Sequence, residues 1–189
     1  QFIAEGQDQT RGWFYTLHVL ATALTSGENP ALPVERSTPA FKNVIVNGIV
    51  LAEDGKKMAK KLKNYPEPDL MFHKYGADSV RYYLATSPVM HAENLNFSEK
   101  GVADVFRRTV LTLWNVVSFY KLYDDGKKRK TPKDPSHVLN QWILVKLNQL
   151  TTDITDGYES YDLNKAARPI DEFVQELSTW YVRRSRDRC

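Results

Sequence analysis

The sequence contains a single cysteine, Cys189, among its 189 residues. One thiol cannot close an internal disulfide, and it cannot supply the paired thiolates of a structural zinc site. The four histidines lie too far apart for metal-ligand spacing; they are His18, His73, His91 and His137. No Gly-x-Ser-x-Gly elbow is present either. The sequence therefore gives no support for a disulfide framework, a metal centre or a serine hydrolase.

Long apolar runs are also missing. No stretch approaches the roughly 20 consecutive apolar residues that a transmembrane helix needs, and no secretory leader pattern opens the sequence. Apolar residues make up 42% and charged residues 26%, with a formal net charge of only +3. This balance excludes a disordered tail and is sufficient for one core or two small adjoining ones. We expect a soluble, cytoplasmic protein.

Both ends of the sequence look internal to a larger chain. It begins without methionine, at Gln1, in what reads as the interior of a strand. At Cys189 the helical pattern is still running. We therefore expect this chain to be a piece of a longer protein.

The first part of the sequence mixes strand and helix patterns. Residues 2–4 form a short apolar strand, and apolar residues recur at helical spacing from Asp8 onward. A second apolar stretch, residues 44–51, surrounds Asn47 and Gly48, a dipeptide typical of hairpins and tight turns. A strand, a helix and a returning strand predict part of a parallel α/β sheet.

The rest of the sequence is mainly helical. Two short helices are predicted over residues 70–74 and 78–86, around Gly76. From about Ser98 onward, three apolar stripes at helical spacing predict three amphipathic helices that share a core as a bundle, with Pro169 bending or restarting the third. The expected fold class is α/β followed by all-α.

A lysine-rich loop follows the second apolar stretch. Five lysines fall within eight positions, residues 56–63, so they repel one another and need an anionic partner or full solvation. The loop is not a Walker-type phosphate loop, because Gly55 lacks the upstream glycine and the following Ser or Thr. It could instead clamp a polyphosphate, since ammonium groups can follow charge onto a leaving pyrophosphate. The alternative is a solvated turn.

Residues 5–14 place acids, amides and glycines where a strand ends and a helix begins. In α/β sheets, ligands bind at the carboxyl ends of strands, against helix N-termini. The carboxylates of Glu5 and Asp8 could hold ribose hydroxyls or an ammonium group. The alternative is that Asp8 only caps the helix.

Residues 180–188 carry four arginines within six positions, with aromatic residues beside them. Such a cluster suits a phosphate backbone. The alternative is a solvated helix end whose cations complement the helix dipole.

Taken together and in this order, the three segments resemble class I aminoacyl-tRNA synthetases, and within them the isoleucyl family. Residues 57–61, Lys-Met-Ala-Lys-Lys, are similar to the KMSKS signature. Residues 5–14 are similar to the family's Glu-Gly-x-Asp-Gln-x-Arg-Gly-Trp-Phe segment, and residues 180–188 to a stretch of its anticodon-binding domain. Valyl and leucyl relatives share the lysine loop but are not expected to carry the other two segments in this form.

The resemblance implies three regions. Residues 1–66 would be the second half of a Rossmann-like nucleotide-binding catalytic domain, ending in the KMSKS-like loop. Residues 67–97 would be a connecting helical region, and residues 98–189 the start of a helical anticodon-binding domain. The implied reaction is ATP-dependent activation of isoleucine to isoleucyl-adenylate, followed by transfer to tRNA(Ile), with Mg²⁺ accompanying ATP.

The resemblance also implies roles for individual residues. Lys57 and Lys60 would stabilise the ATP phosphates as catalytic residues, and Trp13 would line the isoleucine side-chain pocket. The residues implied in binding ATP or the adenylate are Glu5, Gly6, Asp8, Gln9, Asn47, Gly48, Met58 and Lys60. The residues implied in binding tRNA are Arg183, Arg184, Arg186 and Arg188.

Two departures from the family pattern matter. Ala59 and Lys61 stand where the signature has serines, so those positions offer no hydroxyl group while the charges remain. The family's second ATP signature, His-x-Gly-His, is absent, as is the editing insertion; both would lie upstream of Gln1. We expect the isolated chain to activate no amino acid, and no zinc site in this segment. A non-catalytic tRNA- or RNA-binding module, a structural helical scaffold and a valyl- or leucyl-type fragment remain open.

Overall fold

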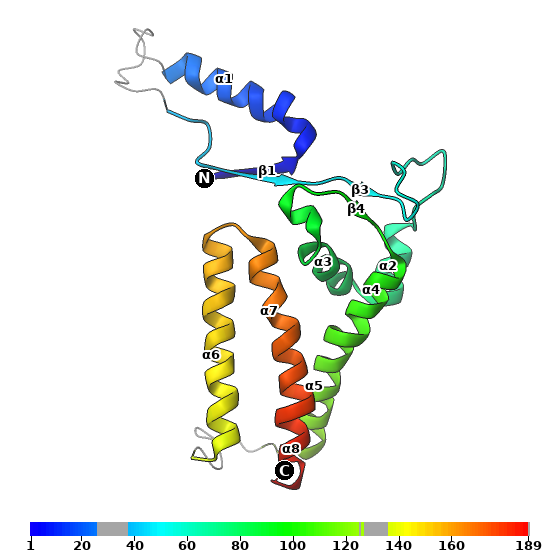
Figure 1. Cartoon of the computed structure of the whole chain (residues 1–189), viewed down its shortest axis with the longest axis vertical. Coiled ribbons are helices and arrows are strands. Elements are labelled where there is room, and N and C mark those ends of the chain that lie inside the picture. The colour runs from blue at the N-terminus through cyan, green and yellow to red at the C-terminus, as the bar shows by residue number, and fades with distance from the viewer. Residues whose placement is uncertain (26–37, 125, 127–135, 189) are drawn as a thin grey trace.

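The computed structural model describes residues 1–25, 38–124, 126 and 136–188. Short strands and a covering helix occupy one end of the molecule, and long helices run from there to the other end (Figure 1). The predicted order, an α/β part followed by an all-α part, is confirmed. Among the described residues, no helix is both long enough and apolar enough to cross a membrane.

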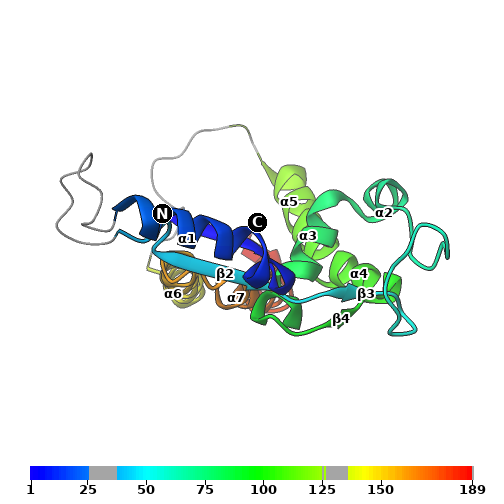
Figure 2. The same ribbon diagram turned by 90° about the horizontal axis from the view of Figure 1, so that it is seen from above.

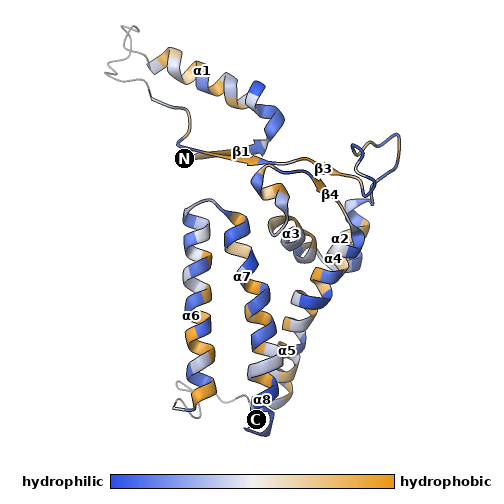
Figure 3. Cartoon of the chain, viewed as in Figure 1, coloured by the Kyte–Doolittle hydropathy of each residue, from blue (hydrophilic) through white to orange (hydrophobic). Residues whose placement is uncertain are grey.

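A strand, a helix and a parallel strand form the first unit, as the sequence predicts. Strand β1 (Phe2–Gly6) pairs in parallel with β2 (Asn43–Asn47), with Gly6 opposite Asn47. Helix α1 (Trp13–Thr25) connects towards β2 and lies along the two strands (Figure 2). Ile3 of β1 and Phe14 of α1 are buried. Figure 3 shows β1 as one of the more hydrophobic segments, which explains why it needs this cover.

The predicted hairpin or tight turn at Asn47 and Gly48 is wrong. The chain continues from β2 into β3 (Val50–Leu51), which pairs in parallel with β4 (Leu95–Asn96) and not with β2. The Gly48 N–H donates to the carbonyl of Val89 at 2.8 Å. A Cβ at position 48 would lie 1.8 Å from the carbonyl oxygen of Glu93. Glycine is required here because another backbone approaches closely, not because the chain reverses.

The start of α1 also differs from the prediction. A 3₁₀ turn, η1 (Gln7–Arg11), precedes the helix, which begins at Trp13 and not near Asp8. The Trp13 N–H donates to Oε1 of Gln9 at 3.1 Å, so Gln9 caps the helix. Asp8 does not; its Oδ2 accepts a hydrogen bond from Nε2 of Gln9 at 3.0 Å and so holds the capping side chain.

Two short helices connect the strands to the long helices. Helices α2 (Pro68–Tyr75) and α3 (Ala77–Ala85) flank Gly76 as predicted, and Gly76 has φ +79°, which favours glycine. A further 3₁₀ turn, η2 (Pro88–His91), leads to β4. The core of this region combines buried residues with partly buried aromatic and aliphatic residues. Its members are Met71, Val80 and Val102, with Tyr75, Tyr83, Leu84 and Phe97 packed against them.

Three long helical rods form the rest of the chain that the structure describes. The first comprises α4 (Glu99–Val105), a π-helical stretch η3 (Phe106–Val110) and α5 (Leu111–Tyr123). Its start matches the prediction, because Oγ of Ser98 accepts the Gly101 N–H at 3.3 Å. The second is α6 (Val138–Glu159). The third comprises α7 (Leu163–Gln175), the π-helical stretch η4 (Glu176–Val182), α8 (Arg183–Ser185) and η5 (Arg186–Arg188).

Pro169 lies inside α7 and does not restart it. The hydroxyl of Tyr82, from α3, bridges the helix at this point: it donates to the carbonyl of Ala167 at 3.0 Å and accepts from the Asp171 N–H at 3.1 Å. Residues 167 and 171 are one helical turn apart and flank the proline, which has no N–H of its own. A side chain from the strand end of the molecule thus supports the proline-containing turn of α7.

Asp171 joins the first and third rods. Its carboxylate accepts hydrogen bonds from Nε of Arg108 at 3.2 Å and from Oγ1 of Thr109 at 2.7 Å. Burial pushes the pKa of Asp171 upward, but the hydrogen bonds from Arg108 and Thr109 lower it by more, so the pKa is below its ordinary value. Asp171 is therefore ionised at neutral pH and fixes α7 against η3.

Candidate functional site

The parallel pairing of β1 and β2 gathers one group of predicted site residues. Gly6 and Asn47 are opposite one another at the carboxyl ends of the two strands. Asp8 and Gln9 lie in the turn that follows β1, and Gly48 follows Asn47. We call these residues, with Glu5, the strand-end cluster. The parallel pairing thus places polar residues from both strands at one edge of the sheet.

Carboxylates in the strand-end cluster are presented to solvent. Glu5 and Asp8 are both exposed. A Cβ at Gly6 would lie only 2.7 Å from Oδ1 of Asp8, so the missing side chain leaves room for that carboxylate to fold back towards the strand end. Trp13, at the first turn of α1, keeps 48% of its surface exposed, so its ring is available to an apolar group. The cluster can accept hydrogen bonds from hydroxyl or ammonium groups.

The lysine loop starts directly after β3 and is anchored to it. Lys57 forms an isolated antiparallel bridge with Leu51 of β3. The Ala52 N–H donates to the carbonyl of Lys56 at 2.8 Å, and Gly55 turns the chain with φ +78°. Asp54 accepts from the Lys56 N–H at 3.1 Å, and its Oδ2 lies 3.1 Å from Nζ of the same lysine. These contacts with Lys56 lower the pKa of Asp54.

The second half of the lysine loop is a hydrogen-bonded turn. The N–H groups of Leu62 and Lys63 donate to the carbonyl of Ala59 at 3.0 and 3.1 Å. Lys63 adopts a left-handed φ of +47°, which returns the chain towards its start. The sequence pattern suggested no role for Asn64, yet its carboxamide contacts both sides of the loop: Nδ2 donates to the carbonyl of Lys57 at 3.2 Å, and Oδ1 accepts from the Ala59 N–H at 3.0 Å.

Lysine side chains and Met58 point in different directions from this loop. The side chains of Lys57 and Lys60 are exposed, whereas Met58 is partly buried. Met58 borders a polar cavity of about 340 Å³ together with Glu53 and Asn64. It also borders an apolar cavity of about 300 Å³ together with residues of the core. Met58 therefore lies under the loop, while the ammonium groups are directed to solvent.

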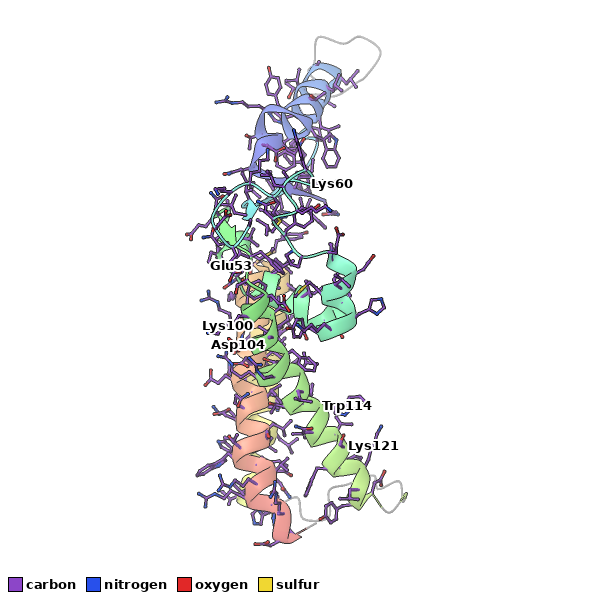
Figure 4. All side chains as sticks on the ribbon, turned by 90° about the vertical axis from the view of Figure 1, so that its right-hand side faces the viewer. Glu53, Lys60, Lys100, Asp104, Trp114 and Lys121 are labelled. Carbon is purple, nitrogen blue, oxygen red and sulfur yellow. The ribbon has the colours of Figure 1, made fainter. Side chains whose placement is uncertain are left out.

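The strand-end cluster and the lysine loop lie one after the other along the same edge of the molecule. Figure 1 shows the loop beyond β3, on the side away from the long helices, and Figure 4 places Lys60 towards the strand end of the molecule, far from Lys121 of α5. The structure thus brings Glu5, Asp8 and Asn47 together through strand pairing. The lysines lie further along the continuation of β2.

The arginine cluster lies at the opposite end of the molecule, at the end of the third rod (Figure 1). The guanidinium of Arg184 is 4.5 Å from the centre of the Trp180 ring, and that of Arg186 is 5.8 Å from the Phe119 ring. Both arginines and Arg183 are exposed. Aromatic stacking orders a guanidinium while leaving its outer face open to an anion.

Arg188 is held differently from the other arginines. Its guanidinium donates to Oγ of Ser185 at 2.6 Å and to Oδ1 of Asn140 at 3.4 Å. Oδ1 of Asn140 also accepts from the hydroxyl of Tyr181 at 2.9 Å. Arg188 therefore joins α6 to the end of the third rod, and its predicted contact with tRNA would have to compete with these bonds.

Among the described residues, no group of three or more His, Cys, Asp or Glu side chains is arranged to hold a metal ion.

Two family descriptions match the chain. Residues 1–96 match "tRNA synthetases class I (I, L, M and V)", and residues 140–189 match "Anticodon-binding domain of tRNA ligase". These ranges contain the strand-end cluster and lysine loop in the first case, and the arginine cluster in the second.

Curated relatives resemble the chain over nearly its whole length. It is 46% identical over 99% of its length to an isoleucine–tRNA ligase of Protochlamydia amoebophila, and 47% identical over 99% to one of Chlamydia trachomatis serovar D. A "probable isoleucine–tRNA ligase, cytoplasmic" of Enterocytozoon bieneusi is 46% identical over 98%. The chain spans only 17% of the length of the first two and 18% of the third.

A solved structure shares the fold. The ternary complex of an Agrobacterium radiobacter LeuRS with tRNA and LeuAMS aligns with 100% of this chain at a TM-score of 0.72, with 17% sequence identity, over 23% of the LeuRS chain. The arrangement of strands, connecting helices and long rods is thus found within a larger protein.

Proposed function

The chain belongs to the class I tRNA synthetases of the I, L, M and V group, and on this premise we propose that it is the part of an isoleucine–tRNA ligase that contacts the ATP phosphates and the tRNA. The family resemblance read from the three sequence segments is confirmed. The amino acid specificity is proposed from the isoleucine–tRNA ligases that are 46–47% identical.

One observation carries the proposal. Two exposed lysines, Lys57 and Lys60, project from a hydrogen-bonded loop that continues the strand carrying Asn47, and Asn47 pairs with Gly6 at the strand-end cluster. A ligand with a polyphosphate at one end and hydroxyl and ammonium groups at the other fits this order of charges. ATP together with an amino acid has these features.

In the proposed reaction the carboxylate of isoleucine attacks the α-phosphorus of ATP. A bond forms between a carboxylate oxygen and the α-phosphorus. The bond from the α-phosphorus to the oxygen that bridges it to the β-phosphorus breaks, and pyrophosphate leaves with that oxygen. Lys57 and Lys60 neutralise the charge that shifts onto the leaving pyrophosphate. Carboxylates of Glu5 and Asp8 accept hydrogen bonds from ribose hydroxyls or from the amino group, and Trp13 lines the side-chain pocket.

The remaining proposed binding roles follow from position. Gln9, Gly6, Asn47 and Gly48 contribute backbone and amide groups near the nucleotide, and Met58 supports the lysine loop from below. Because the described residues offer no cation cage, Mg²⁺ would be held mainly by the ATP phosphates and water. In the cytoplasm, the isoleucyl group is then transferred to a hydroxyl of tRNA(Ile), whose phosphates contact Arg183, Arg184 and Arg186. Arg188, which the sequence also assigned to tRNA binding, is bound to Ser185 and Asn140 and holds the end of the third rod.

The domain assignment is also proposed on these grounds: a catalytic part over residues 1–66, a connection over 67–97 and an anticodon-binding part from 98 onward. The two hydrogen bonds of Tyr82 to α7 support a firm junction between the connection and the bundle. The bond of Arg108 to Asp171 then fixes two rods of the bundle against one another. We expect such a junction to keep the tRNA-binding end in a fixed relation to the activation site.

The test is amino-acid-dependent ATP–pyrophosphate exchange by the full-length protein. We expect the highest kcat/KM with isoleucine, and charging of tRNA(Ile). A higher kcat/KM with valine or leucine would assign the protein to one of those specificities. Salt-dependent RNA binding without exchange for any of the three would support a non-catalytic RNA-binding module instead.

A further inference from the structure

Asn64 occupies an unusual position for a residue outside the signature segment. Its one carboxamide spans the lysine loop, donating to the carbonyl of Lys57 and accepting from the N–H of Ala59. The side chain is partly buried, and it borders the polar cavity beneath the loop. A carboxamide donates through its nitrogen and accepts through its oxygen, so one neutral side chain can bind both backbone groups at once.

These two bonds connect Lys60 to the sheet. The carbonyl of Leu51 in β3 accepts from the N–H of Phe97 at 2.8 Å, and Leu51 bridges Lys57. Asn64 then links Lys57 to Ala59, the residue before Lys60. Asn64 therefore provides side-chain hydrogen bonds that tie the turn carrying Lys60 to Lys57, the residue that bridges β3.

Besides the bonds of Asn64, the loop is held by backbone hydrogen bonds, among them those that the carbonyl of Ala59 accepts from Leu62 and Lys63. Leu62 is 62% exposed, and the space beneath Met58 contains two cavities, so apolar packing contributes little here. Neighbouring lysines repel one another, and the left-handed backbone of Lys63 opposes the folded form of the loop. Hydrogen bonds from Asn64 therefore act against a local tendency of the loop to open.

We propose that Asn64 is a positioning residue, which holds residues 57–63 as one ordered unit so that Lys57 and Lys60 meet the leaving pyrophosphate together. This inference rests on the proposed function. Asn64 does not touch the reacting atoms; it acts by placing the two ammonium groups before the reaction begins. Misplacement of a catalytic group by about 1 Å is sufficient to cost on the order of 10²-fold in rate.

Two readouts on the full-length protein test the proposal. In single-turnover isoleucyl-adenylate formation, Asn64→Ala is expected to lower the rate at saturating ATP roughly 10- to 100-fold while KM for ATP and for isoleucine changes little. In limited trypsin digestion, cleavage after the lysines of the loop is expected to accelerate roughly 5- to 100-fold, because the loss of two hydrogen bonds increases the open population.

Asn64→Asp provides a graded variant. Aspartate can still accept from the Ala59 N–H, but it cannot donate to the Lys57 carbonyl, so intermediate values are expected in both assays. Asn115→Ala, at an exposed position on α5, is the matched control and should equal wild type in both.

The outcomes separate this inference from the proposed function. If wild type performs no isoleucine-dependent activation, the proposed function fails, and the digestion rates still report whether Asn64 orders the loop. If wild type is active and Asn64→Ala matches it in rate and in digestion, Asn64 is not a positioning residue. Faster digestion with an unchanged rate would equally overturn the inference, since the order of the loop would then not matter for activation.

Discussion

Gly48 gives the sharpest structural prediction, because the space for a side chain is already taken by backbone. A Cβ at this position would lie 1.8 Å from the carbonyl oxygen of Glu93 and 2.9 Å from its nitrogen, whereas ordinary contact starts at 3.4 Å. Neither atom belongs to a flexible side chain. Gly48→Ala must therefore move the segment that leads into β4 away from the segment that joins β2 to β3.

The cost can be worked out from what such a movement breaks. The Gly48 N–H to Val89 bond of 2.8 Å and the Leu95 N–H to Ile49 bond of 3.0 Å both cross this contact. Overpacking of this kind typically costs 1–3 kcal/mol, and losing backbone hydrogen bonds adds to it, so we expect about 3–5 kcal/mol for Gly48→Ala. For a chain of this size, that corresponds to a fall of roughly 6–20 °C in melting temperature.

Thermal unfolding of the purified chain, followed by far-UV circular dichroism, measures this effect. The control is Gly55→Ala, where φ is +78° but a Cβ would meet only the Asn96 side chain, at 3.7 Å. In that variant the free energy of unfolding should fall only by the cost of placing alanine in the left-handed region, about 1–2 kcal/mol. A Gly48→Ala variant that melts together with Gly55→Ala would show that the two segments do not approach as described.

Three further predictions concern the long helices. Because the pKa of folded Asp171 lies below its ordinary value of 3.8, its carboxylate stabilises the fold at neutral pH, and this contribution is lost as the pH falls through the folded-state pKa. Asp171→Asn should therefore have a lower melting temperature than wild type at neutral pH. A difference in melting temperature that does not become smaller below pH 3.8 would contradict this. Arg183→Ala should reduce the slope of log tRNA affinity against log salt by about one unit for each phosphate that the protein no longer neutralises, and an unchanged slope would refute such an interaction. Arg188→Ala should mainly lower the melting temperature, since its guanidinium binds Ser185; a reduced salt slope at unchanged stability would contradict that role.

Local patterns predicted most of the elements. The apolar stripe that begins near Ser98 predicted the first rod, and the parallel strands followed from a strand, a helix and a returning strand. The turn predicted at Asn47 and Gly48 was wrong, because a glycine that a close backbone contact requires cannot be distinguished in the sequence from one that a turn requires. Such a contact, here with Glu93, is remote in sequence and leaves no local signal.

In the site, too, residues with a local sequence signal were predicted and residues that depend on contacts in the fold were not. Carboxylates and lysines were recognisable because their charge and spacing suggest chemistry by themselves. Asn64 was not, since a single asparagine after a lysine-rich segment reads as an ordinary loop residue until its two hydrogen bonds are seen. Gln9, which caps α1 in place of Asp8, was missed because glutamine is an uncommon cap and its reach depends on the 3₁₀ turn before the helix. No local sequence signal marks Asn64, because the left-handed φ of Lys63 before it is seen only in the structure.

The lysine loop is proposed to act on the charge of the leaving pyrophosphate and not on ground-state binding of ATP. Single-turnover isoleucyl-adenylate formation by full-length Lys60→Ala, measured across an ATP titration, tests this role most directly. Because Lys60 is exposed on the loop, we expect the rate at saturating ATP to fall by about 10²–10³, or roughly 3–4 kcal/mol, with KM for ATP nearly unchanged. A manyfold increase in KM for ATP at a constant rate would make the loop a ground-state binding element and contradict the proposed role.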